Sequence, residues 1–83
     1  TPVKTRVVGA SLPEGGLAGP LREIQGRYPD VAIGSYPYYR GKTFGASLVL
    51  RSKSERDLQA ALDDVIAMIK DLGAEPLLET PSA

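Results

Sequence analysis

The chain has 83 residues, its ten basic and ten acidic side chains cancel, and it contains neither cysteine nor histidine. A chain of this length forms one small domain with a modest core, and its zero net charge gives no long-range field to attract nucleic acid or anionic lipid. Disulfides, thiolate metal sites and histidine acid/base chemistry are excluded, and with no apolar run near the roughly 20 residues of a membrane-spanning helix we expect a cytoplasmic protein without a membrane partner.

The chain is expected to begin with a strand and a helix. The stretch "VKTRVV" (residues 3–8) alternates as a half-buried strand does, and Gly9 is expected to end it. Apolar residues then recur at helical spacing through "LAGPLREIQGRYP". Because proline is tolerated only in the first turn, Pro20 predicts a helix that begins near Ala18 or Gly19 and ends before Pro29.

Two further strands form a predicted hairpin. "VAIGSY" (residues 31–36) and "TFGASLVLRS" (residues 43–52) are rich in β-forming residues, and "PYYRGK" (residues 37–42) is expected to be the loop between them. Tyr36 is expected to pack across the hairpin against Phe44, because a large aromatic residue inside a strand usually belongs to the core.

The last helix has the clearest pattern in the chain. Ser52 and Ser54 are both candidate N-caps, and Gly73 stands where a left-handed C-terminal cap is expected. One side of the helix carries a predicted core stripe of Leu58, Ala61, Leu62, Val65, Ile66, Ile69 and Leu72. A short edge strand in "EPLLET" would complete the sheet.

These elements predict a single α+β domain over residues 1–83, a two-layer sandwich in the order β-α-β-β-α with a possible fourth strand. Both helices are expected on one face of a small sheet, as in ferredoxin-like (split βαβ) or KH-like folds. Because the chain does not begin with Met and ends in the polar stretch "ETPSA", we expect a C-terminal fragment of a longer protein.

The predicted hairpin loop holds the candidate binding residues. Tyr38, Tyr39, Arg40 and Lys42 combine aromatic rings with positive charge, which suits a nucleotide base with its phosphates or a single strand of nucleic acid. The alternative is that these residues keep an exposed hairpin tip soluble and discourage pairing at the sheet edge. No catalytic, cofactor-binding or metal-ligating residue is assigned, because no Ser/His, Cys/His or P-loop arrangement exists in the sequence.

A second, weaker signal is Gly16-x-x-Gly19, which formally matches the GxxG loop of KH domains. A KH loop joins two helices and usually carries basic residues, whereas these glycines precede one predicted helix. We therefore interpret them as a tight turn between strand and helix.

The hairpin region resembles a known family. "RYPDVAIGSYPYYRGKTFGASLVLRS", followed by a helix ending in "IKDLGAEP", is similar to the C-terminal segment of CinA-like (competence/damage-inducible protein A) proteins and to the corresponding region of eukaryotic FAD synthases. The similarity runs from about Thr5 to Pro76, and its most specific part is the run from Gly34 to Pro37.

The resemblance implies an accessory α+β domain, KH-like in outline, beside a larger N-terminal molybdopterin-binding-type domain. The whole protein would then be a molybdopterin-binding protein or a divalent-metal-dependent pyrophosphatase acting on ADP-ribose or FAD, with its catalytic motifs outside this chain. We therefore expect a domain without catalysis or a cofactor of its own, serving contacts between domains or in a homodimer. We also expect the hairpin tip to contribute to a neighbouring nucleotide site. The alternatives are an RNA-binding KH-like module, which the zero net charge disfavours, and a small-ligand regulatory sandwich.

Overall fold

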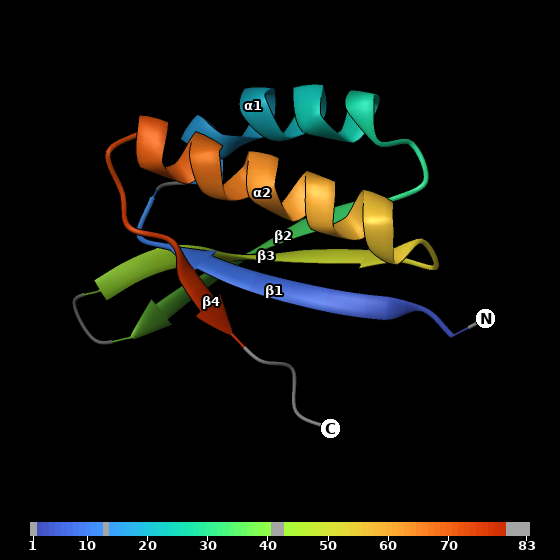
Figure 1. Ribbon diagram of the computed structural model, residues 1–83. Coiled ribbons are helices and arrows are strands. Elements are labelled where there is room, and N and C mark those ends of the chain that lie inside the picture. The colour runs from blue at the N-terminus through green and yellow to red at the C-terminus, as the bar shows by residue number, and fades with distance from the viewer. Residues whose placement is uncertain (1, 13, 41–42, 80–83) are drawn as a thin grey trace.

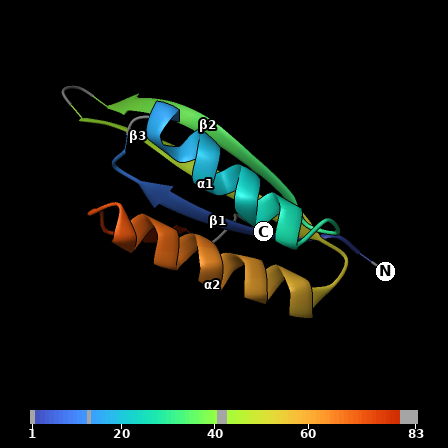
Figure 2. The same ribbon diagram turned by 90° about the horizontal axis from the view of Figure 1, so that it is seen from above.

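The computed structural model describes residues 2–12, 14–40 and 43–79, and in them four strands and two helices. The elements are β1 (Lys4–Ala10), α1 (Glu14–Arg27), β2 (Ala32–Arg40), β3 (Thr43–Ser52), α2 (Glu55–Asp71) and β4 (Leu77–Glu79). Both helices lie on the same side of the sheet, and from above they run beside one another (Figures 1 and 2). The predicted two-layer α+β sandwich is therefore confirmed, and the fourth strand forms.

The strand order in the sheet is β2-β3-β1-β4, and all neighbours are antiparallel. This arrangement, with α1 connecting β1 to β2 and α2 connecting β3 to β4, is the ferredoxin-like one. β2 and β4 are the edge strands. Because the helices cover only one face of the sheet, the other face is free of helices (Figure 1).

The first strand is longer than the sequence predicts. β1 does not end at Gly9 but continues to Ala10. Gly9 is paired on both sides, with Ser47 of β3 and with Leu77 of β4. Pairing with two neighbours holds this glycine in the sheet, although an isolated glycine in a strand pattern usually indicates a break.

The first helix also starts earlier than predicted. It begins at Glu14, so Pro20 lies inside the helix and not in its first turn. Pro20 cannot donate the usual bond to the Gly16 carbonyl. The fully buried Leu17 before it and the buried Ile24 after it hold both halves of the helix on the core, which offsets this loss.

The Gly16-x-x-Gly19 motif consequently lies within α1. Neither the turn that we expected nor a KH-type loop is present at this position. No atom lies within 4 Å of the place where a side chain would start at either glycine, so no close packing requires them.

The predicted loop of the hairpin is mostly strand. β2 continues to Arg40, which pairs with Thr43, so the candidate residues Tyr38 and Tyr39 belong to a strand. Pro37 is tolerated because β2 is an edge strand, where a missing amide removes no bond from a neighbour on that side.

The core lies between the sheet and the helices, and most of the predicted stripe of α2 is in it. Leu58, Ala61, Leu62, Val65 and Ile69 are buried, together with Met68, which we did not predict, whereas Leu72 is 42% exposed. Ser54 is the N-cap of α2, and its hydroxyl accepts a hydrogen bond from the Asp57 amide at 3.3 Å. Gly73 has the expected positive φ of 87°.

Candidate functional site

The predicted binding cluster is only partly within the described residues. Tyr38 is half-buried on β2, and the backbone of Tyr39 and Arg40 continues that strand. Lys42 lies outside the described residues, as do the side chains of Tyr39 and Arg40. Ligand contact at this cluster therefore stays a prediction.

Tyr38 has a structural use within the hairpin. It lies opposite Gly45 of β3, and a Cβ added to Gly45 would be only 2.6 Å from the Tyr38 hydroxyl oxygen. The tyrosine thus fills the space that the glycine leaves, as aromatic residues do beside glycines in β-sheets.

Tyr36 is more exposed than we expected. The register pairs it with Ser47 and not with Phe44, and the tyrosine is 57% exposed. Its ring lies over Gly34, with Cε2 and the hydroxyl oxygen each 3.3 Å from the place where a Cβ of Gly34 would stand. Tyr36 is therefore not a core residue, and its ring is available for contact.

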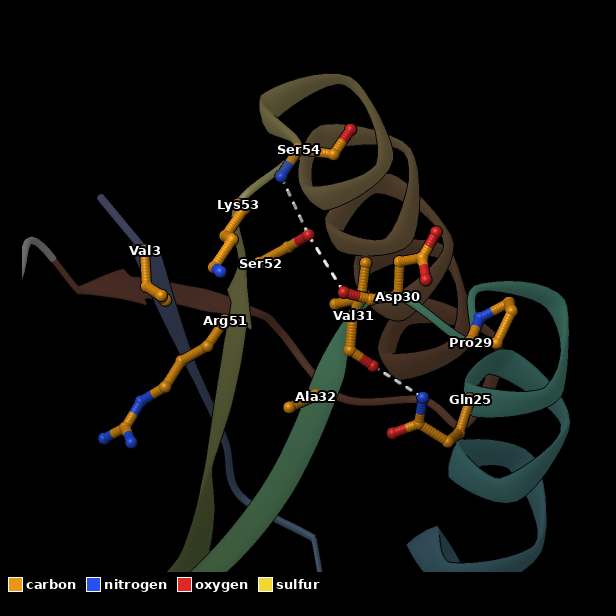
Figure 3. A pocket seen from close by; sticks show the side chains of 10 residues that line it. All are labelled: Val3, Gln25, Pro29, Asp30, Val31, Ala32, Arg51, Ser52, Lys53 and Ser54. Atoms are coloured by element: carbon orange, nitrogen blue, oxygen red, sulfur yellow. Dashed lines mark hydrogen bonds between the residues drawn. The ribbon is translucent and has the colours of Figure 1, made fainter. Parts of the chain in front are cut away.

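A hollow lies at the end of the sheet where β2 begins and β3 ends. Its volume is about 700 Å³, and it is lined by Val3, Gln25, Pro29, Asp30, Val31, Ala32, Arg51, Ser52, Lys53 and Ser54 (Figure 3). A smaller hollow of about 230 Å³ adjoins it and is lined by Ala32, Ile33, Gly34, Tyr36, Val49 and Arg51.

One side of the larger hollow is formed by a network of hydrogen bonds around Ser52. The Ser52 hydroxyl, on a residue only 5% exposed, donates to the Asp30 carbonyl at 3.0 Å and accepts from the Ser54 amide at 3.0 Å (Figure 3). This residue ties the start of β2 to the end of β3 and to the N-terminus of α2. Its hydroxyl is thus engaged with the backbone.

Gln25 has a similar role on the other side of the hollow. Its side-chain amide nitrogen donates to the carbonyls of Tyr28 at 3.1 Å and Val31 at 2.5 Å, and its oxygen accepts from the Ile33 amide at 3.1 Å. The glutamine therefore fixes the turn between α1 and β2. Neither Gln25 nor Ser52 is left free to act on a ligand.

The other half of the hollow is cationic. Arg51 and Lys53 are exposed, and neither forms an ion pair or side-chain hydrogen bond in the part of the chain that the structure describes. Figure 3 shows the Arg51 side chain extending away from the helices, with the Asp30 carboxylate on the opposite side of the strands. The positive charge of Arg51 is thus not neutralised locally.

Two other ionisable groups are engaged between elements. The pKa of Glu55 is lowered from its ordinary value of 4.5, chiefly because Lys4 donates a hydrogen bond to it at 2.8 Å and pairs with it electrostatically. The pKa of Tyr28 is raised from 10.0, chiefly because its hydroxyl donates to the Asp64 carboxylate at 2.8 Å. Both contacts fasten α2 to another element of the fold.

A separate groove of about 330 Å³ lies between α1 and α2. Glu23, Asp64 and Asp71 line it, whereas its one lining cation, Arg27, is paired with Asp64 at 3.4 Å. The excess of acidic residues makes this groove unsuitable for an anionic ligand.

With this geometry described, comparison with known proteins gives the family. Residues 2–76 match the family model described as "FAD synthase, middle domain". The chain belongs to this family. The FAD synthase half of the resemblance inferred from the hairpin is therefore supported. No curated protein matches the chain.

Solved structures agree with the fold of the chain. The designed protein Foldit4 matches it with a TM-score of 0.68 at 13% identity, over 98% of this chain and 97% of that one. A designed protein with a ferredoxin fold, solved by NMR, matches with a TM-score of 0.53 at 12% identity, over 95% and 88% of the two chains. At these identities the matches show the fold alone.

Sequence reasoning missed Tyr36, Arg51 and Lys53 as a group. A signal was present, because a glycine inside a strand often marks a place where something approaches closely, and Gly34 is two residues from Tyr36. Only the register between β2 and β3 shows that Arg51 lies opposite Ala32 and beside the same hollow.

Proposed function

We propose that this chain is a non-catalytic accessory domain of a CinA-like, nucleotide-utilising protein. Membership of the FAD synthase middle-domain family supports a nucleotide-related context. The resemblance of the hairpin supports a neighbouring molybdopterin-binding-type domain in the same polypeptide, with the catalytic residues of the whole protein outside this chain.

The observation that carries the proposal is how the polar residues of the hollow at the end of the sheet, where β2 begins and β3 ends, are used. Two neutral polar side chains of its lining, Ser52 and Gln25, are both hydrogen-bonded to backbone groups. A nucleophile needs an adjacent base to activate it, and neither residue has one among its partners. These side chains stabilise the fold and do not form a catalytic pair.

The divalent metal that the resemblance implies for the whole protein does not fit this domain. Among residues 2–12, 14–40 and 43–79 no group of three or more acidic side chains is placed to hold such an ion. We therefore assign no metal-dependent step to these residues.

The helix-free face of the sheet is the surface that we assign to contact with the neighbouring domain. Tyr36 is 57% exposed and Leu77 is 52% exposed on this side, while the opposite side is covered by the helices. Tyr36 and Leu77 lie on the opposite edge strands β2 and β4, so a protein that contacts both would cover the full width of the sheet. A second copy of this chain is the alternative occupant.

The experiment is a turnover assay on the isolated chain. We expect no hydrolysis of ADP-ribose or FAD in the presence of magnesium or cobalt. Appreciable turnover that disappears on removal of the metal would overturn the non-catalytic assignment.

Sedimentation of the same sample distinguishes the two occupants of the helix-free face. Contact with a different domain predicts a monomer at micromolar concentration. A dimer that Tyr36→Ser dissociates would instead assign the face to a second copy.

No observation favours RNA binding. The GxxG motif lies within α1, and the basic and acidic residues of the chain balance.

A further inference from the structure

Two hollows meet on the surface at one end of the sheet. The smaller contains Tyr36 and the larger contains Lys53, and both are lined by Ala32 and Arg51. The surface from Tyr36 to Lys53 is therefore continuous. It has an aromatic end and a cationic end.

The aromatic end is shaped by a glycine. Because Gly34 has no side chain, the Tyr36 ring lies back along β2 over it and toward the level of Val49 on β3. A ring that is supported on one side by backbone and is 57% exposed offers a surface on which a planar ligand can stack. Stacking of a base on an aromatic side chain is a common source of affinity for nucleotides.

The cationic end lies further along the same face. Arg51 is two residues beyond Val49, which corresponds to about 7 Å along a strand. Lys53 follows two residues later, in the bend just beyond the end of β3, and lines the larger hollow together with Arg51. An arginine with no protein partner presents a planar set of donors that matches a phosphate.

The other cations described on the sheet and between the helices are occupied. Lys4 and Arg6 pair with Glu55 at 2.8 and 3.8 Å, and Arg27 pairs with Asp64. Arg51 and Lys53 differ from them in lining hollows without a carboxylate partner. Arg22, Arg56 and Lys70 on the helices also form no ion pair among the described residues, but they line neither hollow, so Arg51 and Lys53 are the unpaired cations that border this surface.

We propose that Tyr36, Arg51 and Lys53 bind a small ligand in which a planar aromatic ring is joined to a phosphate, as in a mononucleotide. The ring stacks on Tyr36, and the phosphate accepts hydrogen bonds from Arg51 and pairs with Lys53. The inference deepens the proposed function and rests on it in one respect, namely that this domain contributes binding and not chemistry. It places the nucleotide contact beside Arg51 and away from the hairpin tip.

The test is isothermal titration of the chain with AMP, adenosine and inorganic phosphate. AMP is expected to bind more tightly than either part alone, and its affinity is expected to fall as salt is added because exposed charges are screened. Arg51→Ala is expected to weaken AMP binding about tenfold or more, the loss typical of a charged hydrogen bond. Tyr36→Leu is expected to weaken AMP about tenfold and phosphate hardly at all.

Arg22→Ala is the matched control. It removes one exposed arginine from α1, outside both hollows, and leaves the same net charge as Arg51→Ala. AMP affinity is expected to stay within twofold of the unaltered chain. Thermal unfolding of each variant verifies that it is folded before it is titrated.

Three results would overturn the proposal: no AMP binding at millimolar concentration, AMP binding no tighter than phosphate, or equal losses in the Arg51 and Arg22 variants. These outcomes do not decide whether the proposed accessory role is correct. If the chain neither binds AMP nor turns over ADP-ribose or FAD, only this ligand site is refuted and the accessory role stands. Turnover of ADP-ribose or FAD removes the accessory role whether or not AMP binds.

Discussion

Gly45 is the position where a single methyl group should disturb the sheet most. An added Cβ would stand 2.6 Å from the Ala10 carbonyl oxygen and 2.6 Å from the Tyr38 hydroxyl oxygen. Ordinary contact begins at 3.4 Å, so each neighbour must retreat by about 0.8 Å. The tyrosine can rotate, but the Ala10 oxygen belongs to the backbone of β1, which pairs with β3 at this point.

The expected cost follows from these contacts. Overpacking of this kind costs about 1 to 3 kcal/mol, and the lower chain entropy of alanine in the unfolded state returns about 0.4 to 1 kcal/mol. We expect Gly45→Ala to destabilise the domain by about 1 to 2 kcal/mol. This is a large fraction of the roughly 4 to 12 kcal/mol expected for a domain of this size.

Urea unfolding measures the effect, and the midpoint is expected to fall by about 1 M. Gly26→Ala is the matched control, because Gly26 is exposed in α1 with no atom within 4 Å of the new Cβ, and it should stabilise by about 0.5 to 1 kcal/mol. The cost of Gly45→Ala should shrink, but not vanish, in a Tyr38→Ala background. A Gly45→Ala domain as stable as the unaltered one would refute the packing argument.

Three further changes test the core, the turn network and the surface charges. Val65→Ala removes two methyl groups from a fully buried position on α2. The free energy of unfolding, measured with urea, is expected to fall by about 1 to 3 kcal/mol. Ser52→Ala leaves two backbone partners without their hydroxyl, which should cost about 1 to 3 kcal/mol, and an unchanged midpoint would contradict the network. Glu55→Gln removes a group whose folded pKa is lowered by Lys4, so its stabilising effect should be present above pH 4.5 and be lost as pH falls through the lower folded pKa. Unfolding curves of the two proteins should therefore converge in acid and differ at neutral pH.

Local patterns were sufficient to predict much of the fold. The 3.6-residue repeat of α2, its Ser54 cap and Gly73 are each encoded within a few neighbouring residues, and the structure confirms them. The order of elements also followed from the alternation of strand and helix patterns. These features need no knowledge of distant contacts.

The errors share one physical cause, which is support from distant parts of the chain. Gly9 and Pro37 look like breaks in isolation, yet pairing with neighbouring strands keeps both in the sheet. Pro20 looks like the start of a helix, yet core packing on both sides allows it in the interior. The exposure of Tyr36 and its place near Arg51 depend on the β2 to β3 register, which the sequence pattern alone does not specify.

The account depends on the claim that the helix-free face of the sheet is the working surface and that the helical layer is structural. NMR mapping of backbone amides during titration of the chain with AMP tests this claim most directly. We predict that the chemical shifts of the amides of Gly34, Tyr36, Val49 and Arg51 change. The amide chemical shifts of α1 and α2 should stay unchanged. Shifts confined to the groove between the two helices would contradict the claim.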